Sequence, residues 1–293
     1  MTESEWLVST DPQAMLAWLM GDYSPVARDL GSARVSDRKL RLLACAFLRT
    51  VWRQLDVTSQ RAADVAERFA DGQADEAERT QFHDTDRREN YPARAACFGN
   101  PTEAAHWTLQ RLMVNQHHQP HSLVVDAKAL ADCLRDIVGN PFRPVVLPPG
   151  ELTKCRTCNG EGELTTSHRF DCYNCDGQGT RHKPCSWLTP LVVSLAQGAY
   201  DNRLPSGQLD PEILAVLSDA LEDAGCPTHE TATERVRVCT AFMYSHQEMG
   251  VECNCDSWRD VKVERPHPIL AHLRSPGPHW RGCWAVDLLL GKE

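Results

Sequence analysis

Two copies of one eight-residue pattern, Cys-x-x-Cys-x-Gly-x-Gly, lie close together in the middle of the chain, at Cys155 to Gly162 and at Cys172 to Gly179. Two cysteines at this spacing in a tight turn bring their sulfur atoms within bonding distance of one metal ion, about 2.3 Å for Zn²⁺. The glycines suit the turn after each pair, because a residue without Cβ adopts positive φ at no steric cost. Thirteen residues separate the two pairs, which is close to the loop of a zinc ribbon or hairpin. We therefore predict that one Zn²⁺ is bound by Cys155, Cys158, Cys172 and Cys175.

Disulfide bonds, a redox-active dithiol and simple buried thiols are the alternatives to zinc at this quartet. The chain contains 13 cysteines, an odd number, and its first residues show no basic segment followed by an apolar run, as a secretory signal would. We therefore expect a cytoplasmic protein whose cysteines stay reduced. A redox dithiol usually has a single Cys-x-x-Cys that opens a helix after a strand, whereas this motif is doubled and followed by glycines. Zinc is the interpretation that the pattern favours.

A site of four thiolates also indicates what the metal does. The thiolates fill a tetrahedral coordination shell and leave no position for water or substrate, so we predict structural zinc rather than hydrolysis. The metal would hold two short turns rigid. The hairpin between them would then present Leu164, Phe170 and Tyr173 to a partner.

Other cysteines and histidines form weaker candidates. A second zinc site of the Cys₃His kind is a possible assignment for Cys239, His246, Cys253 and Cys255. Against it, the Cys-Asn-Cys spacing is short for a zinc-binding pair, and a buried cysteine with a surface histidine is the alternative. His182 or Cys185 can replace one of the four predicted ligands.

The remaining candidates point to packing or to loops. The histidines at 117, 118 and 121 lie in a polar stretch typical of a loop between helices. Five isolated cysteines are predicted to be small buried hydrophobes, namely Cys45, Cys97, Cys133, Cys226 and Cys283. Cys283 and His279 can be imagined as nucleophile and base, but Cys283 adjoins Trp284 and an apolar run. With no phosphate-binding loop in the sequence either, we do not predict an enzyme.

The charge of the chain is unfavourable for contact with nucleic acid. The formal net charge is −9, so the average electrostatic field repels phosphate. Between Glu151 and Pro184, five basic residues are balanced by five acidic ones. A nucleic-acid-binding finger remains an alternative, in which the basic side chains face one way and Phe170 or Tyr173 stacks on bases. No apolar stretch approaches the about 20 residues of a membrane span, so we predict no membrane segment.

Helix signals dominate outside the cysteine-rich segment. A capping side chain followed by proline begins several helices, as at Asp11-Pro12 and Thr189-Pro190. Ser36 opens a run with apolar residues at steps of three and four, and Thr58 or Ser59 is predicted to cap the next helix. The expected helices cover residues 12–20, 37–55, 59–71, 102–112, 123–139, 190–199, 211–225 and 281–291.

Strand signals are scarce by comparison. Outside the cysteine-rich segment, only Val261 to Val263 and Pro144 to Leu147 are predicted to be extended. We therefore predict a mainly α fold, with a multi-helix body and an inserted small β-hairpin that binds zinc.

Three separated stretches resemble, as a set, a large family of uncharacterised bacterial proteins found in many paralogous copies per genome. They are MTESEWLVSTDPQAMLAWL with SDRKLRLLACAFLR, RDIVGNPFRPV with WLTPLVVSLAQGAYD, and LSDALEDAGC with SPGPHWRGCWAVDLLLGKE. The resemblance covers the larger part of the chain and implies a helical fold. It implies no activity.

The same resemblance suggests how the chain is organised. In that family NPFRPV runs within a few residues into WLT, so the intervening segment here resembles an insertion. A zinc hairpin suits such a position, because its ends are close together and loop-closure entropy grows only slowly with length. We predict an N-terminal helical region at 1–146, a zinc-finger insertion at 147–186, and a C-terminal helical region at 187–293 that packs against the first. A second insertion at about 227–267 carries the Cys239 group.

The doubled cysteine motif itself resembles the zinc-binding repeat of DnaJ-type heat-shock co-chaperones. Those proteins use four copies for two zinc ions, whereas two copies suffice for one. The sequence contains no His-Pro-Asp tripeptide, which those co-chaperones use to stimulate the ATPase of a DnaK-type chaperone, so we do not predict that partner. The resemblance implies the metal site and recognition of an unfolded or extended segment.

Together these features predict a zinc-binding adaptor for protein interaction, chaperone-like and without catalysis. Nucleic-acid binding and an enzyme of unknown type within the helical body are the alternatives. A deep pocket with a titratable group of strongly shifted pKa would favour the enzyme.

Overall fold

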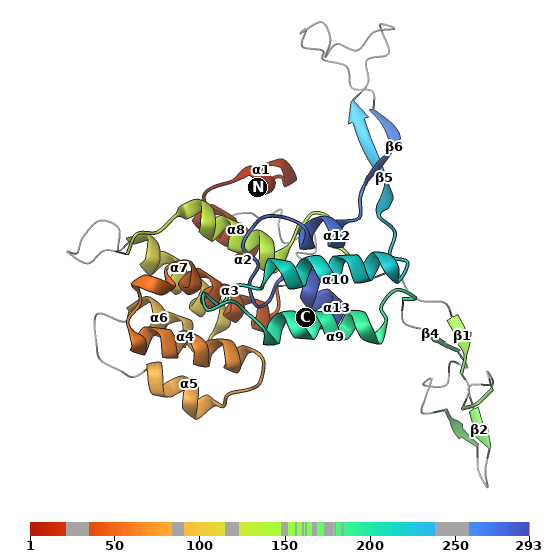
Figure 1. Ribbon diagram of the computed structural model, residues 1–293, viewed down its shortest axis with the longest axis horizontal. Helices are drawn as coiled ribbons and strands as arrows, with labels where there is room; N and C mark the ends of the chain where they lie inside the picture. Colours follow the sequence, from red (N-terminus) through yellow and green to blue (C-terminus); the bar gives the residue numbers. More distant parts are fainter. Residues whose placement is uncertain are drawn as a thin grey trace, which may run out of the picture.

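The computed structural model describes residues 1–21, 35–83, 91–114, 123–147, 152–155, 157–159, 161, 163–165, 169–172, 178, 180–182, 185–237 and 258–292. Within these residues the chain is mainly helical, as predicted, and its strands form three antiparallel two-stranded ladders. Figure 1 shows a helical body from which two arms project, one built on residues 152–182 and one on residues 229–266. None of the described helices has the length and apolar character to cross a bilayer.

The N-terminal part of the body consists of short helices that begin at good capping residues. Asp11 accepts hydrogen bonds from the backbone amides of Gln13 and Ala14, and Ser36 accepts one from Lys39, which satisfies amides that a helix start leaves without partners. The elements are α1 Glu3–Val8, α2 Pro12–Met20, α3 Asp37–Thr50, a 3₁₀ turn Trp52–Gln54, α4 Val57–Ala70, α5 Glu76–His83, α6 Tyr91–Ala96, α7 Pro101–Val114 and α8 Ala127–Val138.

Helix α3 lies between two hydrophobic clusters because apolar residues surround most of it. Phe47 on one side packs with Trp6 of α1 and Leu134 of α8, and Leu48 on the other packs with Ala63 of α4. A fully buried side chain of this size contributes about 1.5–3 kcal/mol relative to an exposed one. The two clusters therefore fix α3 as the central helix of this region.

The C-terminal part has its own core and is continuous with the β5–β6 arm. The elements are α9 Pro190–Asp201, α10 Pro211–Asp223, β5 His229–Arg237, β6 Trp258–Pro266, α12 Pro268–Leu273 and α13 Trp284–Leu290. Leu214 and Leu217 of α10 pack with Leu270 of α12 and Val286 of α13, all at most 2% exposed. This core is as well buried as that of the N-terminal part.

Buried polar contacts and one tryptophan join the two parts. Trp280 precedes α13 yet packs within the N-terminal cluster. Asp287 of α13 is 1% exposed and accepts hydrogen bonds from Arg38 of α3 (2.7 Å) and the Tyr200 hydroxyl (2.6 Å). Because a buried carboxylate is costly unless it is paired, these contacts lock the C-terminal helix onto α3.

Several expectations about the body differ from the structure. Helix α8 begins at Ala127 and not at residue 123. Helix α3 ends at Thr50 and a 3₁₀ turn follows, instead of one helix to residue 55. The cap of α4 is Asp56, not Thr58 or Ser59, because its carboxylate reaches the amide of Ser59 at 2.7 Å. Pro144 to Leu147 forms no strand.

The expected extended segment at Val261 to Val263 is part of a long hairpin. Strand β5 pairs with β6 from His229 opposite Pro266 to Arg237 opposite Trp258. Along β6, described side chains of both faces are largely exposed, so apart from Val261 and Val263 the strand carries little apolar pattern in the sequence. This hairpin occupies the place of the second predicted insertion.

Candidate metal centres

The knuckle arm, residues 152–182, contains two short ladders that bring Cys172 to the first cysteine pair. Strand β1 Leu152–Lys154 pairs with β4 Thr180–His182, and β2 Glu163–Thr165 pairs with β3 Arg169–Asp171. Cys155 follows β1 directly and Cys172 follows β3 directly. The β1–β4 ladder thus holds the two ends of the arm beside each other. Each of the two ladders has a cysteine directly after one of its strands.

Three of the four predicted ligands converge. The sulfur atoms of Cys155, Cys158 and Cys172 all lie within 4.8 Å of one another, and the sulfurs of Cys155 and Cys172 are 3.8 Å apart. A disulfide would need about 2.05 Å, whereas ligands at about 2.3 Å from a tetrahedral zinc lie about 3.8 Å apart. Cys155, Cys158 and Cys172 form no disulfide, so their spacing fits a shared metal ion and not a covalent pair. Cys175 lies outside the described residues.

The backbone around the first pair prepares its sulfurs for a metal. The amides of Cys158 and Thr157 donate to the sulfur of Cys155 and, with the neighbouring thiols, lower the pKa of Cys155 to about 6 in spite of burial. A low pKa favours the thiolate, which is the metal-binding form. Asn159 adopts φ of 52°, and the amide of Glu161 donates to the carbonyl of Cys158 at 3.0 Å. An asparagine thus supplies the left-handed turn. The predicted role of the glycines lies outside the described residues.

Leu164, one of the residues expected to face a partner, lies next to the cysteines. It is half-buried and packs against the cluster of Cys155, Cys158 and Cys172, opposite Phe170 in the ladder register. Part of its side chain thus covers the site and part is exposed. The side chains of Phe170 and Tyr173 lie outside the described residues.

The alternative ligands do not join the knuckle, as far as they are described. Cys185 is buried in the C-terminal core with Trp187 and Cys226, so it belongs to the body. The side chain of His182 lies outside the described residues. So do the histidines at 117, 118 and 121 and the whole candidate second site, which comprises Cys239, His246, Cys253 and Cys255.

A second convergence of metal-binding side chains lies inside the helical body, where the sequence did not predict one. We call it the body cluster, and it consists of Asp136, His272, His279 and Cys283, with one donor atom of each within 4.8 Å of all the others. The Oδ1 atom of Asp136 is 2.7 Å from Nδ1 of His279 and 3.1 Å from Nε2 of His272. The same Nε2 atom is 3.2 Å from the sulfur of Cys283.

Groups outside the body cluster hold its members in place. The backbone amide of Trp280 donates to Oδ2 of Asp136 at 2.7 Å. Burial alone would raise the pKa of Asp136, but hydrogen bonds and charge interactions with the two histidines lower it to about 2. Burial likewise opposes the charged form of His279, yet the bond to Asp136 raises its pKa. The carboxylate is therefore kept ionised although it is 3% exposed.

The geometry argues against a cysteine nucleophile in the body cluster. In a catalytic triad the acid orients the base through the ring nitrogen opposite the one that faces the nucleophile. Here the same nitrogen of His272 faces both the carboxylate of Asp136 and the sulfur of Cys283. Burial raises the pKa of Cys283 well above its usual range, and its side chain is not exposed at all. The predicted packing role of Cys283 is confirmed as far as its burial goes.

Two members of the body cluster, His279 and Cys283, are close enough in the sequence to be paired as candidates, whereas Asp136 and His272 are not among the residues that the sequence indicates. His272, His279 and Cys283 follow one another at intervals of seven and four residues, a spacing that can be read in the sequence. Asp136 lies on α8, and nothing in its neighbourhood along the chain indicates its partners.

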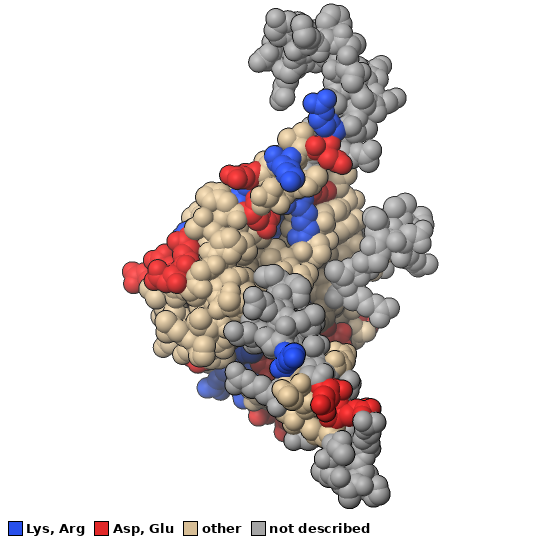
Figure 2. All heavy atoms as spheres, turned by 90° about the vertical axis from the view of Figure 1, so that its right-hand side faces the viewer, with Lys and Arg blue, Asp and Glu red and all other residues tan. Residues whose placement is uncertain are grey.

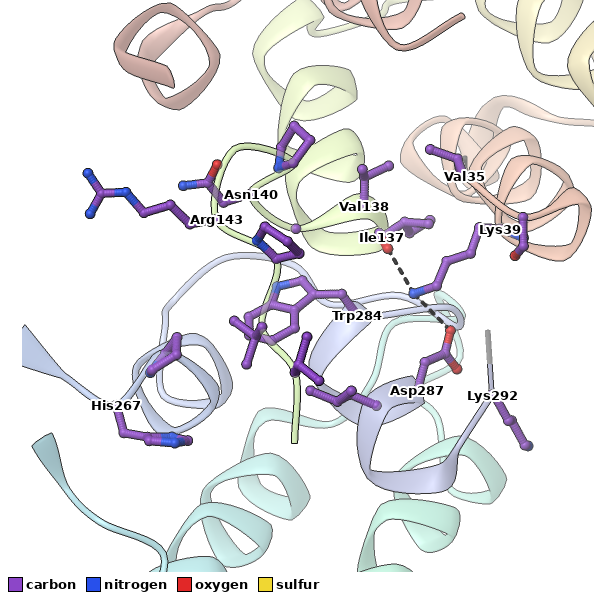
Figure 3. A pocket seen from close by; sticks show the side chains of 18 of the residues that line it. Val35, Lys39, Ile137, Val138, Asn140, Arg143, His267, Trp284, Asp287 and Lys292 are labelled. Carbon is purple, nitrogen blue, oxygen red and sulfur yellow. Dashed lines mark hydrogen bonds and ion pairs between the residues drawn. The ribbon is translucent and has the colours of Figure 1, made fainter. Parts of the chain in front are cut away.

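A cavity of about 780 Å³ lies beside the body cluster, between the end of α8, the start of α3, α12, α13 and the base of the β5–β6 hairpin. Figure 3 shows Trp284 in its middle and Lys39 bound to Asp287 and to the carbonyl of Ile137. Further lining residues are also paired, Arg143 with Glu3 and Arg265 with Glu230. Lys39, Arg143 and Arg265 in the wall of the cavity are thus each paired with a carboxylate, and the Lys292 ammonium lies over the ring of Tyr200 at 5.3 Å.

Comparison of the chain with known protein families, curated proteins and solved structures finds no match.

Proposed function

We propose that this protein is a non-catalytic adaptor whose knuckle arm binds one structural Zn²⁺ and contacts another protein. The ligands would be Cys155, Cys158, Cys172 and Cys175. The observation that supports this most directly is the convergence of three sulfurs that form no disulfide, two of them at the spacing of a tetrahedral zinc site, on an arm that projects from the body (Figure 1). Zinc bound there would keep the two turns rigid and, with four thiolates, leave no position for a substrate.

An extended protein segment is the partner that the arm fits best. In the part of the arm that the structure describes, each ladder has two strands, so the outer strand edges offer backbone groups for strand addition. The resemblance of the motif to DnaJ-type repeats points the same way, toward an unfolded or extended segment. We place this activity in a reducing compartment, the cytoplasm, because the proposed ligands must remain thiolates. The body, on this proposal, is the scaffold that carries the arm.

Nucleic acid is the second candidate partner, and the charges do not favour it. On the face shown in Figure 2 the described Lys and Arg side chains are interspersed with Asp and Glu and form no continuous basic patch. The formal net charge of −9 adds to this. A phosphate-binding arm would also lose affinity steeply as salt increases.

Metal analysis of the purified full chain tests the zinc site. We expect the variants Cys155→Ser and Cys172→Ser each to lose one equivalent of zinc while the helical circular dichroism signal is kept. Cys185→Ala is the matched control, since Cys185 is buried in the body and should leave the zinc content unchanged. Full zinc content in both knuckle variants would refute the proposed ligands.

Binding measurements test the partner class. Fluorescence anisotropy with a reduced and alkylated, permanently unfolded protein should show binding by the parent chain and a clear loss in Cys172→Ser, with little change between low and moderate salt. Binding only to a labelled oligonucleotide, with a steep salt dependence, would replace the adaptor by a nucleic-acid-binding protein.

A further inference from the structure

We propose that the body cluster, formed by Asp136, His272, His279 and Cys283, is a second structural zinc site that joins the two parts of the helical body. Its four donor atoms come from α8, from α12 and from the segment that leads into α13, and they face a common centre. This site is independent of the knuckle arm.

The spacing of the donor atoms allows a tetrahedral ion after a small expansion. Ligands bound at about 2.0–2.3 Å from a tetrahedral zinc lie about 3.3–3.8 Å apart. Oδ1 of Asp136 is 2.7 Å from Nδ1 of His279 and 3.1 Å from Nε2 of His272. The sulfur of Cys283 is 3.2 Å from Nε2 of His272. These are hydrogen-bond distances, so outward movements of about half an ångström create the shell, a change that side-chain torsions can supply.

The atoms that face away from the centre are held in the way that metal ligands usually require. Ligating histidines commonly use their second ring nitrogen to bind a carbonyl, and ligating carboxylates are themselves hydrogen-bonded. Nε2 of His279 lies 3.3 Å from the carbonyl oxygen of Ser275, and Oδ2 of Asp136 accepts from the amide of Trp280 at 2.7 Å. Nδ1 of His279 and Oδ1 of Asp136 are thereby directed inward.

The charge and chemistry of the donors fit Zn²⁺ in a buried place. One carboxylate and one thiolate neutralise a divalent ion, so the complex carries no net charge, which keeps the cost of burial low. Asp136, His279 and Cys283 are each at most 3% exposed. Two imidazoles and a thiolate suit zinc, whereas Ca²⁺ and Mg²⁺ select oxygen ligands. Four protein donors leave the shell closed, which makes the role structural.

Without a metal the same atoms compete with one another. Two imidazole nitrogens converge on one oxygen of Asp136, while one of them also faces the thiol of Cys283. A single ion placed between them would satisfy all four at once. It would tie α8 of the N-terminal part to α12 and to the start of α13, which meet at this point alongside Trp280 and Trp284.

The test uses the full chain with the knuckle disabled. In the Cys155→Ser, Cys172→Ser double variant we expect one equivalent of zinc to remain. Adding His279→Ala should remove it, and so should adding Cys283→Ser, which nearly preserves the side-chain shape. The matched control is His106→Ala, a histidine on α7 that is exposed and remote from the body cluster in sequence, and it should keep the full equivalent.

Cobalt substitution provides a readout that does not depend on stability. With Co²⁺ alone added to the knuckle double variant, we expect the visible absorption of a tetrahedral site and a single thiolate-to-metal charge-transfer contribution, absent from the Cys283→Ser variant. A folded double variant without zinc and without this spectrum would overturn the proposal. So would an equivalent of zinc that survives both His279→Ala and Cys283→Ser. A failure here leaves the knuckle test untouched, because each measurement starts from a different set of ligands.

Discussion

The knuckle and the body cluster place similar donors close together by opposite means. In the knuckle, Cys155 and Cys172 are 17 residues apart in sequence, and short turns and ladders bring them together. In the body cluster, Asp136 and His272 are 136 residues apart, and the packing of α8 against the C-terminal helices brings them together. The first site is made by local backbone geometry and the second by the global fold.

This difference decides what each site depends on. Closing a loop eight times longer costs only about 2 kcal/mol more in chain entropy, which the hydrophobic core of the body readily offsets. The body cluster is therefore held by packing, with or without an ion. Among the knuckle side chains that the structure describes, Cys155, Cys158 and Cys172 are buried and the half-buried Leu164 packs against them. On our proposal the metal keeps this small cluster rigid. Damage to the body cluster should spread through the fold, and damage to the knuckle should stay in the arm.

The largest expected effect is that of Asp136→Ala. This change removes the acceptor for the Trp280 amide and for both histidines, and leaves buried polar groups without partners, so we expect a loss of about 3–5 kcal/mol. Urea unfolding measures it. Asp132→Ala on the same helix is the control, because Asp132 is more exposed and its pairs with Lys128 and Arg135 contribute at most about 1 kcal/mol. Equal losses in the two variants would show that the body cluster has no special role in stability.

Gly139→Ala tests how much the junction of α8 with α13 depends on the backbone conformation of Gly139. Gly139 has φ of 78° and ψ of −153°, a region essentially restricted to glycine. A Cβ there would also lie 3.1 Å from the ring of Trp284. We expect a loss of about 3 kcal/mol in unfolding free energy. Gly72→Ala, at φ of 68° with nothing within 4 Å of the added carbon, should cost only about 1 kcal/mol.

Glu67→Gln tests whether protonation of this buried carboxylate destabilises the helical body at low pH. Burial would raise the pKa of Glu67, but the hydrogen bonds and charge of Arg49, and then those of Arg203, lower it below its usual 4.5. A depressed carboxylate pKa contributes stability that is fully present above pH 4.5 and is lost as the pH falls through the folded-state pKa. We expect the variant to lose about 2 kcal/mol at pH 7 and to unfold with a shallower dependence on pH below 4.5.

Thermal melts followed from pH 7 to pH 3 in the parent chain and in Glu67→Gln give this comparison. Parallel acid curves for the two proteins would mean that Glu67 does not titrate with unfolding. The substitution should leave the zinc content of the knuckle at pH 7 unchanged, because Glu67 lies on α4, far from the arm in the fold (Figure 1).

The sequence predicts features that are made locally and misses those made by distant packing. Asp11 and Ser36 mark helix starts because a cap acts on amides two or three residues away. The first cysteine pair is equally local. In β6 the alternation of Val261 and Val263 indicates an extended segment, but most described side chains of β5 and β6 are exposed and the sequence does not show that the two strands pair. The approach of Asp136 to His272 exists only after the two parts of the body have packed.

Even a local feature, the residue at which a helix starts, is not always predictable from the sequence. Asp56, Thr58 and Ser59 are all good capping residues, and the sequence offers no way to rank them. The structure selects Asp56 because Ser59 is buried at 2% exposure, inside the first turn of α4. Core packing, which sets the depth of each residue, thus decides between caps that propensity treats as equal.

The smallest expected effect is that of the knuckle on the body, and it separates the two regions most directly. In the Cys155→Ser, Cys172→Ser double variant, or after chelation of the metal, we expect the midpoint of thermal unfolding of the helical body to change by less than about 2 °C. The reason is that Cys155, Cys158 and Cys172 pack among themselves and with Leu164, while the hydrophobic clusters of the body contain none of these three ligands. Limited proteolysis should meanwhile become faster within residues 152–182 alone, because the turns lose the ion that holds them. A large fall in the midpoint would mean that the arm and the body fold as one unit, and the distinction between a local and a global site would no longer hold.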